Sequence, residues 1–128
     1  MALLPPQFKK LGDSKLLKQI ETDLEVVETR IQTATAQTNS VVDSMSNHLA
    51  KAGGKRLRPL LVLLTSHLGS GSNSSVMDAA VVMEVTHLAT LYHDDVMDEA
   101  STRRGVDAAH VVWGNNIAIL TGDLLFAR

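Results

Sequence analysis

The chain has 128 residues, of which 45% are hydrophobic and 3% aromatic, and its formal net charge is −2. This length suits one compact domain, and the composition favours helices packed on helices, so we expect an all-α fold. The charge argues against nucleic-acid partners, which usually need a basic surface. Without cysteine there is no disulfide framework and no thiolate zinc site. There is neither a transmembrane run nor a signal-peptide core, which makes a cytoplasmic location the expectation.

The N-terminal part is predicted to contain an arm and a long helix. Residues 1–12 are expected to form an arm, because Pro5-Pro6 disfavours helix. The rest, residues 13–128, is expected to form one helical domain. Asp13 or Ser14 can cap a first helix that runs to about residue 37. Its acidic residues indicate a solvated face: Glu21, Glu25 and Glu28.

Two shorter helices should follow. One is predicted over residues 40–51, and Gly53-Gly54 would end it, because glycine tolerates a left-handed C-cap. Pro59 suits the first turn of the next helix, predicted over residues 60–68 and mostly buried because it is nearly all apolar. Turn residues at 69–75 then indicate a loop.

The C-terminal part is predicted to contain two further helices. A central helix should span residues 76–98, followed by a polar connection over 99–108 with no strand pattern. A final helix should begin near Asn115 and continue to Arg128, since no C-cap signal closes its apolar pattern.

Three carboxylates, Asp94, Asp95 and Asp98, close the central helix. Asp94 and Asp98 lie one turn apart on one face, so their oxygens can reach a shared ligand. Acids at a helix C-terminus oppose the macrodipole and need a compensating cation. Hard oxygen ligands suit Mg²⁺, so we predict a metal site here, the alternative being solvated acids.

Basic residues gather in two segments. GGKRLRP at 53–59 places cations and glycines at a helix N-terminus, where phosphate can bind, although an ordinary basic turn fits equally well. Arg103-Arg104 has the guanidinium geometry that grips phosphate. The pair could instead be solvated or bind a nearby acid (Asp98, Glu99 or Asp107). Together, the acids and cations predict a diphosphate substrate.

Histidines carry less information. His87 lies about two turns before Asp94 on the same face of the central helix, so it can face the site, although a buried core histidine is the commoner case. His48 is expected on the surface.

Four segments, in this order and spacing, resemble the trans-isoprenyl diphosphate synthases. The closest likeness is to bacterial long-chain polyprenyl and geranylgeranyl diphosphate synthases, and it is specific over about residues 45–128. The segments are GGKRLRP at 53–59, HLATLYHDDVMD at 87–98, RRG at 103–105 and WGNNIAILTGDLLFAR at 113–128. The resemblance implies a helical bundle of the isoprenoid synthase type, with only the N-terminal portion present. The family's second aspartate-rich motif and its lysine-threonine pair are absent from this sequence.

The resemblance also implies an activity and a set of roles. Isopentenyl diphosphate would condense with an allylic prenyl diphosphate to give a longer all-trans polyprenyl diphosphate. Asp94 and Asp98 would bind Mg²⁺, Asp95 would support them as the third catalytic carboxylate, and Arg103 would contact the allylic diphosphate. The side chains implied to hold isopentenyl diphosphate are Lys55, Arg58, His87 and Arg104.

Product length is implied by small residues before the acids. Ala89, five residues before Asp94, occupies the position where bulky residues block chain growth in short-chain members. Thr90 and Thr86 are also small enough to admit a long product. A longer product is therefore expected, and Ala89→Phe should shorten it.

Absence of the second motif has consequences. We expect little or no synthase activity from these 128 residues alone, and an exposed apolar face that favours a homodimer or higher oligomer. The main alternative is a non-catalytic helical module, derived from such a synthase, that binds diphosphate and Mg²⁺. A class I terpene cyclase shares an aspartate-rich helix but lacks GGKRLRP and the RRG turn.

Overall fold

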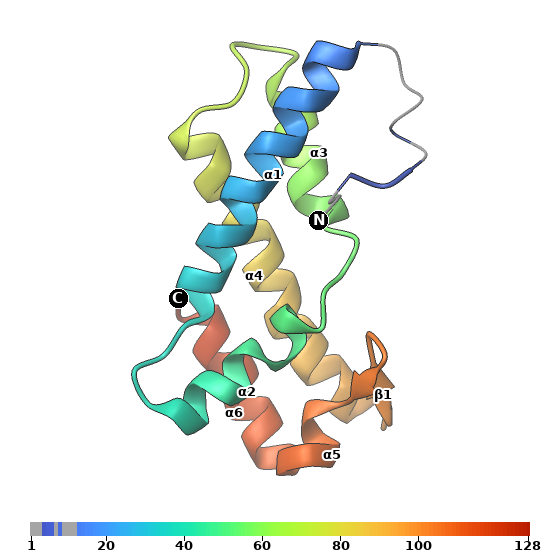
Figure 1. Ribbon diagram of the computed structural model, residues 1–128. Helices are drawn as coiled ribbons and strands as arrows, with labels where there is room; N and C mark the ends of the chain where they lie inside the picture. Colours follow the sequence, from blue (N-terminus) through green and yellow to red (C-terminus); the bar gives the residue numbers. More distant parts are fainter. Residues whose placement is uncertain (1–3, 7, 9–12) are drawn as a thin grey trace. The chain divides into compact units, whose positions relative to one another are not determined.

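The computed structural model describes residues 4–6, 8 and 13–128, and its regular elements are mostly α-helices (Figure 1). The all-α prediction is confirmed. Most of the predicted N-terminal arm lies outside the described residues. None of the helices in the described ranges is long and apolar enough to cross a membrane. The elements are α1 (Ser14–Thr35), α2 (Ser40–Lys51), α3 (Leu57–Ser66), α4 (Ser74–Met97), β1 (Thr102–Arg103), β2 (Val106–Asp107), α5 (Ala109–Trp113) and α6 (Asn115–Phe126).

The chain forms two compact units. The first unit comprises Met1–Arg30 and Lys55–Glu84, and the second unit comprises Ile31–Gly54 and Val85–Arg128. Helices α1 and α4 each contribute residues to both units. The grouping of residues 13–128 into one helical domain stays a prediction.

The first unit is built on the apolar stripe of α1. Asp13 caps this helix, as predicted, because its Oδ1 accepts the N–H of Lys15 at 2.8 Å. Helix α3 begins at Leu57, earlier than predicted, with Pro59 in its first turn. The prediction that α3 is buried on most sides is wrong, because Leu61 is 56% exposed. The buried apolar residues of α1 and α3 in this unit are Ile20, Leu24, Val27, Leu60 and Leu63.

The second unit contains a buried polar corner between α1 and α2. The Thr35 hydroxyl donates to Asn47 Oδ1 at 2.6 Å, and the Ser46 hydroxyl donates to the Thr35 carbonyl at 2.9 Å. Helix α2 also contacts α5 and α6. Because these buried polar groups bond to one another, the corner has a defined geometry.

Glycine permits close packing of α6 on α4 in the same unit. A Cβ placed on Gly122 would lie 2.3 Å from Nε2 of His93, far inside van der Waals contact. The His93 Nε2 also lies 3.0 Å from the carbonyl oxygen of Ile119 in α6. The position of the His93 ring against α6 therefore depends on the missing side chain at position 122.

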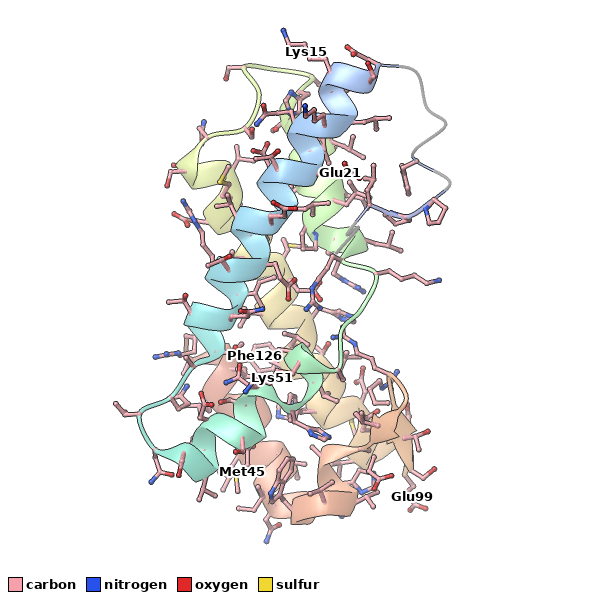
Figure 2. All side chains as sticks on the ribbon, viewed as in Figure 1. Lys15, Glu21, Met45, Lys51, Glu99 and Phe126 are labelled. Atoms are coloured by element: carbon pink, nitrogen blue, oxygen red, sulfur yellow. The ribbon has the colours of Figure 1, made fainter. Side chains whose placement is uncertain are left out.

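The connection after α4 differs most from the prediction. Its last turn closes through Glu99, labelled in Figure 2, which has a left-handed φ of 51°. The Ala100 N–H reaches back to the Asp95 carbonyl at 3.0 Å, which is a Schellman closure. A β-hairpin follows, with Arg103 opposite Val106. The sequence did not predict this hairpin, nor the short helix α5, and α6 ends at Phe126 instead of continuing to Arg128.

Candidate functional site

The three aspartates of α4 differ in exposure. Asp95 lies on the buried stripe of α4 that includes Leu88 and Tyr92, and it is only 1% exposed. Asp94 is half-buried and Asp98 is exposed. One helix end therefore directs one carboxylate into the second unit and leaves the other two accessible.

Arg103 binds the buried aspartate. Its Nε and Nη2 donate to Asp95 Oδ1 at 2.8 and 2.6 Å. The other oxygen, Asp95 Oδ2, is buried without a hydrogen-bond partner among the described residues. The hydrogen bonds that Arg103 donates to Asp95 raise the pKa of Arg103 against the opposing effect of burial, and the charges of Asp95, Asp94 and Asp98 raise it further. Arg103 thus lies in the field of all three acids.

The Arg104 side chain contacts α2 instead of the aspartate that binds Arg103. Its Nη1 donates to the Leu49 carbonyl in α2 at 2.9 Å, and its guanidinium covers Gly54, where a Cβ would lie 2.9 Å from Arg104 Cζ. The Leu49 N–H in turn donates to the Tyr92 hydroxyl, which donates to the Met45 carbonyl at 2.5 Å. Burial raises the pKa of Tyr92 to about 12, although the hydrogen bond from Leu49 and the Arg104 charge oppose the shift. Glycine at position 54 is what allows the guanidinium to lie there.

Two histidines hold the ends of the hairpin segment. His48 Nε2 lies 2.7 Å from the Asp107 carbonyl oxygen, and His110 Nε2 lies 2.7 Å from that of Ala100. The His48 ring also makes an edge contact with Trp113, with centroids 4.9 Å apart. His48 is half-buried, which is compatible with the predicted surface position, and both arginines sit on a hairpin fixed within the second unit.

The other predicted site residues of this unit lie along α4. His87 is half-buried, and the Thr90 hydroxyl donates to its carbonyl at 2.7 Å. Thr86 is exposed. Ala89 is 0% exposed, so any larger side chain there would need space that the present packing does not offer. The roles of these residues stay predictions.

The GGKRLRP segment contributes Lys55, Arg56 and Arg58 to the first unit, and these three cations are not equivalent. Lys55 and Arg58 are exposed, whereas Arg56 is 4% exposed. Arg56 Nε and Nη2 donate to the two carboxylate oxygens of Glu28 at 2.7 and 2.9 Å, and its Nη1 donates to Glu84 Oε1 at 3.0 Å. Burial alone would lower the pKa of Arg56, but the hydrogen bonds and charges of both glutamates raise it.

Sequence reasoning missed both glutamates of this cluster. The prediction that Glu28 is solvated is wrong, since it binds Arg56 and its side chain is 22% exposed. Glu84 carried a detectable signal: it lies four residues before Leu88 on the buried stripe of α4. An acid on such a stripe needs a cationic partner, because charged side chains are almost never buried unpaired.

Asp94 and Asp98 are the residues that could hold a metal ion. Among the described residues, no group of three or more His, Asp or Glu side chains converges on one point. Mg²⁺ usually takes only one or two carboxylates together with substrate phosphates and water. In the part of the chain that the structure describes, neither of the two side chains makes an ion pair or hydrogen bond. The carboxylate pair therefore fits an open site for a hard divalent cation.

The fold identifies the class of protein. The polyprenyl synthase from Caulobacter crescentus, solved in complex with calcium and isoprenyl diphosphate, has a TM-score of 0.82 and 39% identity over 88% of this chain and 34% of its own. Geranylgeranyl pyrophosphate synthase from Corynebacterium glutamicum has a TM-score of 0.78 and 44% identity, covering 92% of this chain and 36% of its own. The helical fold is thus that of isoprenoid synthases.

Sequence comparison identifies the family. Residues 39–128 match the polyprenyl synthetase family. The nonaprenyl diphosphate synthase of Mycobacterium tuberculosis is 44% identical over 118 residues, which are 91% of this chain and 35% of that protein. The chain belongs to the polyprenyl synthetase family, which confirms the predicted resemblance. It spans about a third of the length of the curated relatives that it matches.

Proposed function

We propose that the natural protein carrying this chain is a Mg²⁺-dependent prenyltransferase. It condenses isopentenyl diphosphate with an allylic prenyl diphosphate to make a longer all-trans polyprenyl diphosphate. The observation that carries the proposal is the end of α4, where Asp94 and Asp98 are accessible and Asp95 binds Arg103. The names of the relatives, a nonaprenyl diphosphate synthase and a geranylgeranyl pyrophosphate synthase, support it.

Asp94 and Asp98 are the proposed metal ligands. A bound Mg²⁺ would neutralise the charge on the allylic diphosphate and make pyrophosphate a better leaving group. Asp95 acts indirectly, because its buried carboxylate holds Arg103. The half-exposed guanidinium of Arg103 keeps N–H groups for the same diphosphate.

The remaining basic residues are proposed to bind the second substrate. Lys55, Arg58, Arg104 and His87 are proposed to hold isopentenyl diphosphate. In the reaction, the allylic C–O bond breaks and pyrophosphate leaves with the bonding electrons. The isopentenyl double bond then attacks the allylic carbon, and loss of a proton from the adduct restores a double bond. Arg103, held by Asp95, lowers the barrier because its guanidinium is already oriented where negative charge develops on the departing pyrophosphate.

Product length is proposed to depend on Ala89, with Thr90 and Thr86 nearby on the same helix. A phenylalanine at position 89 would fill space that a growing chain needs, so Ala89→Phe should give a shorter product. Because Ala89 is 0% exposed, overpacking can also destabilise the protein, and the unfolding midpoint has to be measured alongside the product distribution. A shorter product from a stably folded variant supports the role, and an unchanged product rejects it.

A homodimer or higher oligomer is also proposed. Helices α5 and α6 expose several large apolar side chains, among them Phe126, which Figure 2 labels. Apolar groups gathered on neighbouring helices favour association. A monomer by light scattering at micromolar concentration would contradict this proposal. The exposed residues are Val111, Val112, Ile119, Leu120 and Phe126. The cytoplasmic location stays a prediction.

A second candidate function is a non-catalytic module that binds diphosphate and Mg²⁺. This alternative applies to the 128 residues taken alone, which contain one aspartate-rich motif, at residues 94–98. For the 128 residues alone we expect little or no prenyl transfer.

The test is incorporation of labelled isopentenyl diphosphate onto an allylic primer by the purified natural protein. We expect Mg²⁺-dependent products that are lost in Asp94→Asn and Asp98→Asn. Glu99→Gln is the matched control, because it removes one exposed negative charge next to Asp98 and should remain active. Binding of both diphosphates without transfer would favour the non-catalytic module, and no binding at all would reject both functions.

A further inference from the structure

We propose that Glu28 and Glu84 are positioning residues for the diphosphate of isopentenyl diphosphate. Through Arg56 they fix the backbone of the GGKRLRP segment, so that Lys55 and Arg58 present their charges to the substrate. The inference rests on the proposed function of those two cations, and it gives a role to three paired charges, two of them buried, that the reaction itself does not use.

Arg56 cannot act as a substrate ligand. Its side chain is 4% exposed, and all three of its guanidinium nitrogens donate to carboxylates. The fork of two parallel bonds to Glu28 fixes the orientation of the guanidinium plane, and the bond to Glu84 fixes its third corner. Both glutamates belong to helices, Glu28 to α1 and Glu84 to α4, so the anchor is attached to rigid elements.

The backbone at Arg56 needs such an anchor. Its φ of 47° lies in the left-handed region, which is unfavourable for a residue with a Cβ. A backbone of this kind persists only where surrounding contacts determine it. Here the determining contacts are the bonds from the side chain of the same residue to Glu28 and Glu84.

The left-handed turn controls where the neighbouring cations lie. Arg56 is the N-cap of α3, so Lys55 immediately precedes the turn and Arg58 lies in the first helical turn. Both side chains are exposed, and neither makes an ion pair or hydrogen bond in the described part of the chain. Among the residues that the structure describes, no side chain caps the N-terminus of α3, which adds partial positive charge beside the two cations. If the turn relaxed, the spacing between Lys55 and Arg58 would change with it.

The experiment is a two-substrate kinetic study of the purified natural protein. Glu28→Gln and Glu84→Gln should each raise KM for isopentenyl diphosphate about tenfold, as expected for loss of one charge-assisted hydrogen bond in the anchor. KM for the allylic diphosphate should stay within about twofold, because its proposed ligands are other residues. Arg56→Lys keeps the charge but loses the fork, so it should also raise KM for isopentenyl diphosphate.

Glu25→Gln is the matched control, because Glu25 is an exposed acid on α1 and its loss changes the net charge equally. It should change neither KM. Equal changes in both KM values, or variants indistinguishable from Glu25→Gln, would overturn the inference. If Glu84→Gln does not fold, Glu28→Gln carries the test, since its carboxylate is partly exposed. A wild-type protein without prenyl transfer would instead reject the proposed function and the inference together.

Discussion

Arg56 in the first unit and Arg103 in the second unit are both the inward arginine of a basic motif, yet their surroundings differ. Arg56 is 4% exposed and is bound by two glutamates. Arg103 is 32% exposed and is bound by one oxygen of a single aspartate, Asp95. A buried guanidinium whose three nitrogens all donate to carboxylates can only fix the structure. A half-exposed one that is held from one side can still bind a ligand, so pairing and exposure separate these roles where residue type does not.

The largest expected effect tests whether Arg56 has the structural role that this comparison assigns to it. Arg56→Met leaves Glu28 and Glu84 without their cation, and removal of one partner from a buried ion pair typically destabilises a protein by about 3–5 kcal/mol. Arg58→Met, two residues further on and exposed, should change stability by less than about 0.5 kcal/mol. Urea unfolding of the two variants measures the difference. Similar losses for both would show that Arg56 is not an anchor.

The next prediction concerns Tyr92, whose hydroxyl belongs to the hydrogen-bond chain that ends at Arg104. Its pKa is raised from 10.0 to about 12 by burial, so the folded state favours the neutral phenol. The resulting stabilisation is present below pH 10 and is lost as the pH rises toward 12, by roughly 2–3 kcal/mol. Tyr92→Phe should lack this part of the alkaline loss. Tyr92 is the only tyrosine in the sequence, so phenolate absorbance reports its titration directly, and an ordinary pKa would refute the prediction.

A smaller effect is expected at the Asp95–Arg103 pair, the second member of the comparison. Asp95→Asn removes the charged acceptor of Arg103 and should destabilise the protein by about 1–3 kcal/mol. Asp98→Asn should be neutral or stabilising by about 0.3 kcal/mol, because it removes an exposed acid from the negative end of α4. Thermal unfolding of the two variants, measured without Mg²⁺, should show effects of different size. If Asp98→Asn were the more harmful change, the assignment of inward and outward acids would be wrong.

The smallest expected effect lies in the turn that leads into the arginine hairpin. Glu99 has a left-handed φ of 51°, and glycine would remove the steric penalty there. Glu99→Gly should stabilise the protein by about 0.5–1 kcal/mol, whereas Glu99→Ala keeps the penalty and should not. Chemical denaturation of both variants tests this, and equal stability would mean that the turn is not strained.

Much of the fold could be predicted from the sequence because α1 and α2 have strong apolar periodicity, while α4 is a long, mostly apolar run that ends in acidic residues. The prediction for α2, residues 40–51, coincides with the observed Ser40–Lys51. The hairpin could not be predicted in the same way. Its strands have two residues each, too few for an alternating pattern, and Arg104 takes a positive φ in a turn position that usually holds asparagine or glycine.

The acid cluster could be located from the sequence, but the division of labour within it could not. Asp94, Asp95 and Asp98 were predicted to act together, and helical spacing alone favoured Asp94 and Asp98 as a pair. The pairing of Asp95 with Arg103 could not be predicted from the sequence, because it depends on a hairpin that no local pattern indicates. Buried acids such as Asp95 and Glu84 lie on the apolar stripe of α4, and this is the signal that can be used in similar chains.

The most direct test of the account is calorimetric titration of the purified natural protein with an allylic prenyl diphosphate, with and without Mg²⁺. The account predicts that Mg²⁺ tightens binding in the wild type and that the double variant Asp94→Asn/Asp98→Asn loses this tightening. Asp95→Asn should weaken binding in both conditions but keep the tightening, because it acts through Arg103. Tightening that survives in the double variant, or disappears in Asp95→Asn alone, would contradict the proposed division between metal-binding and arginine-holding carboxylates.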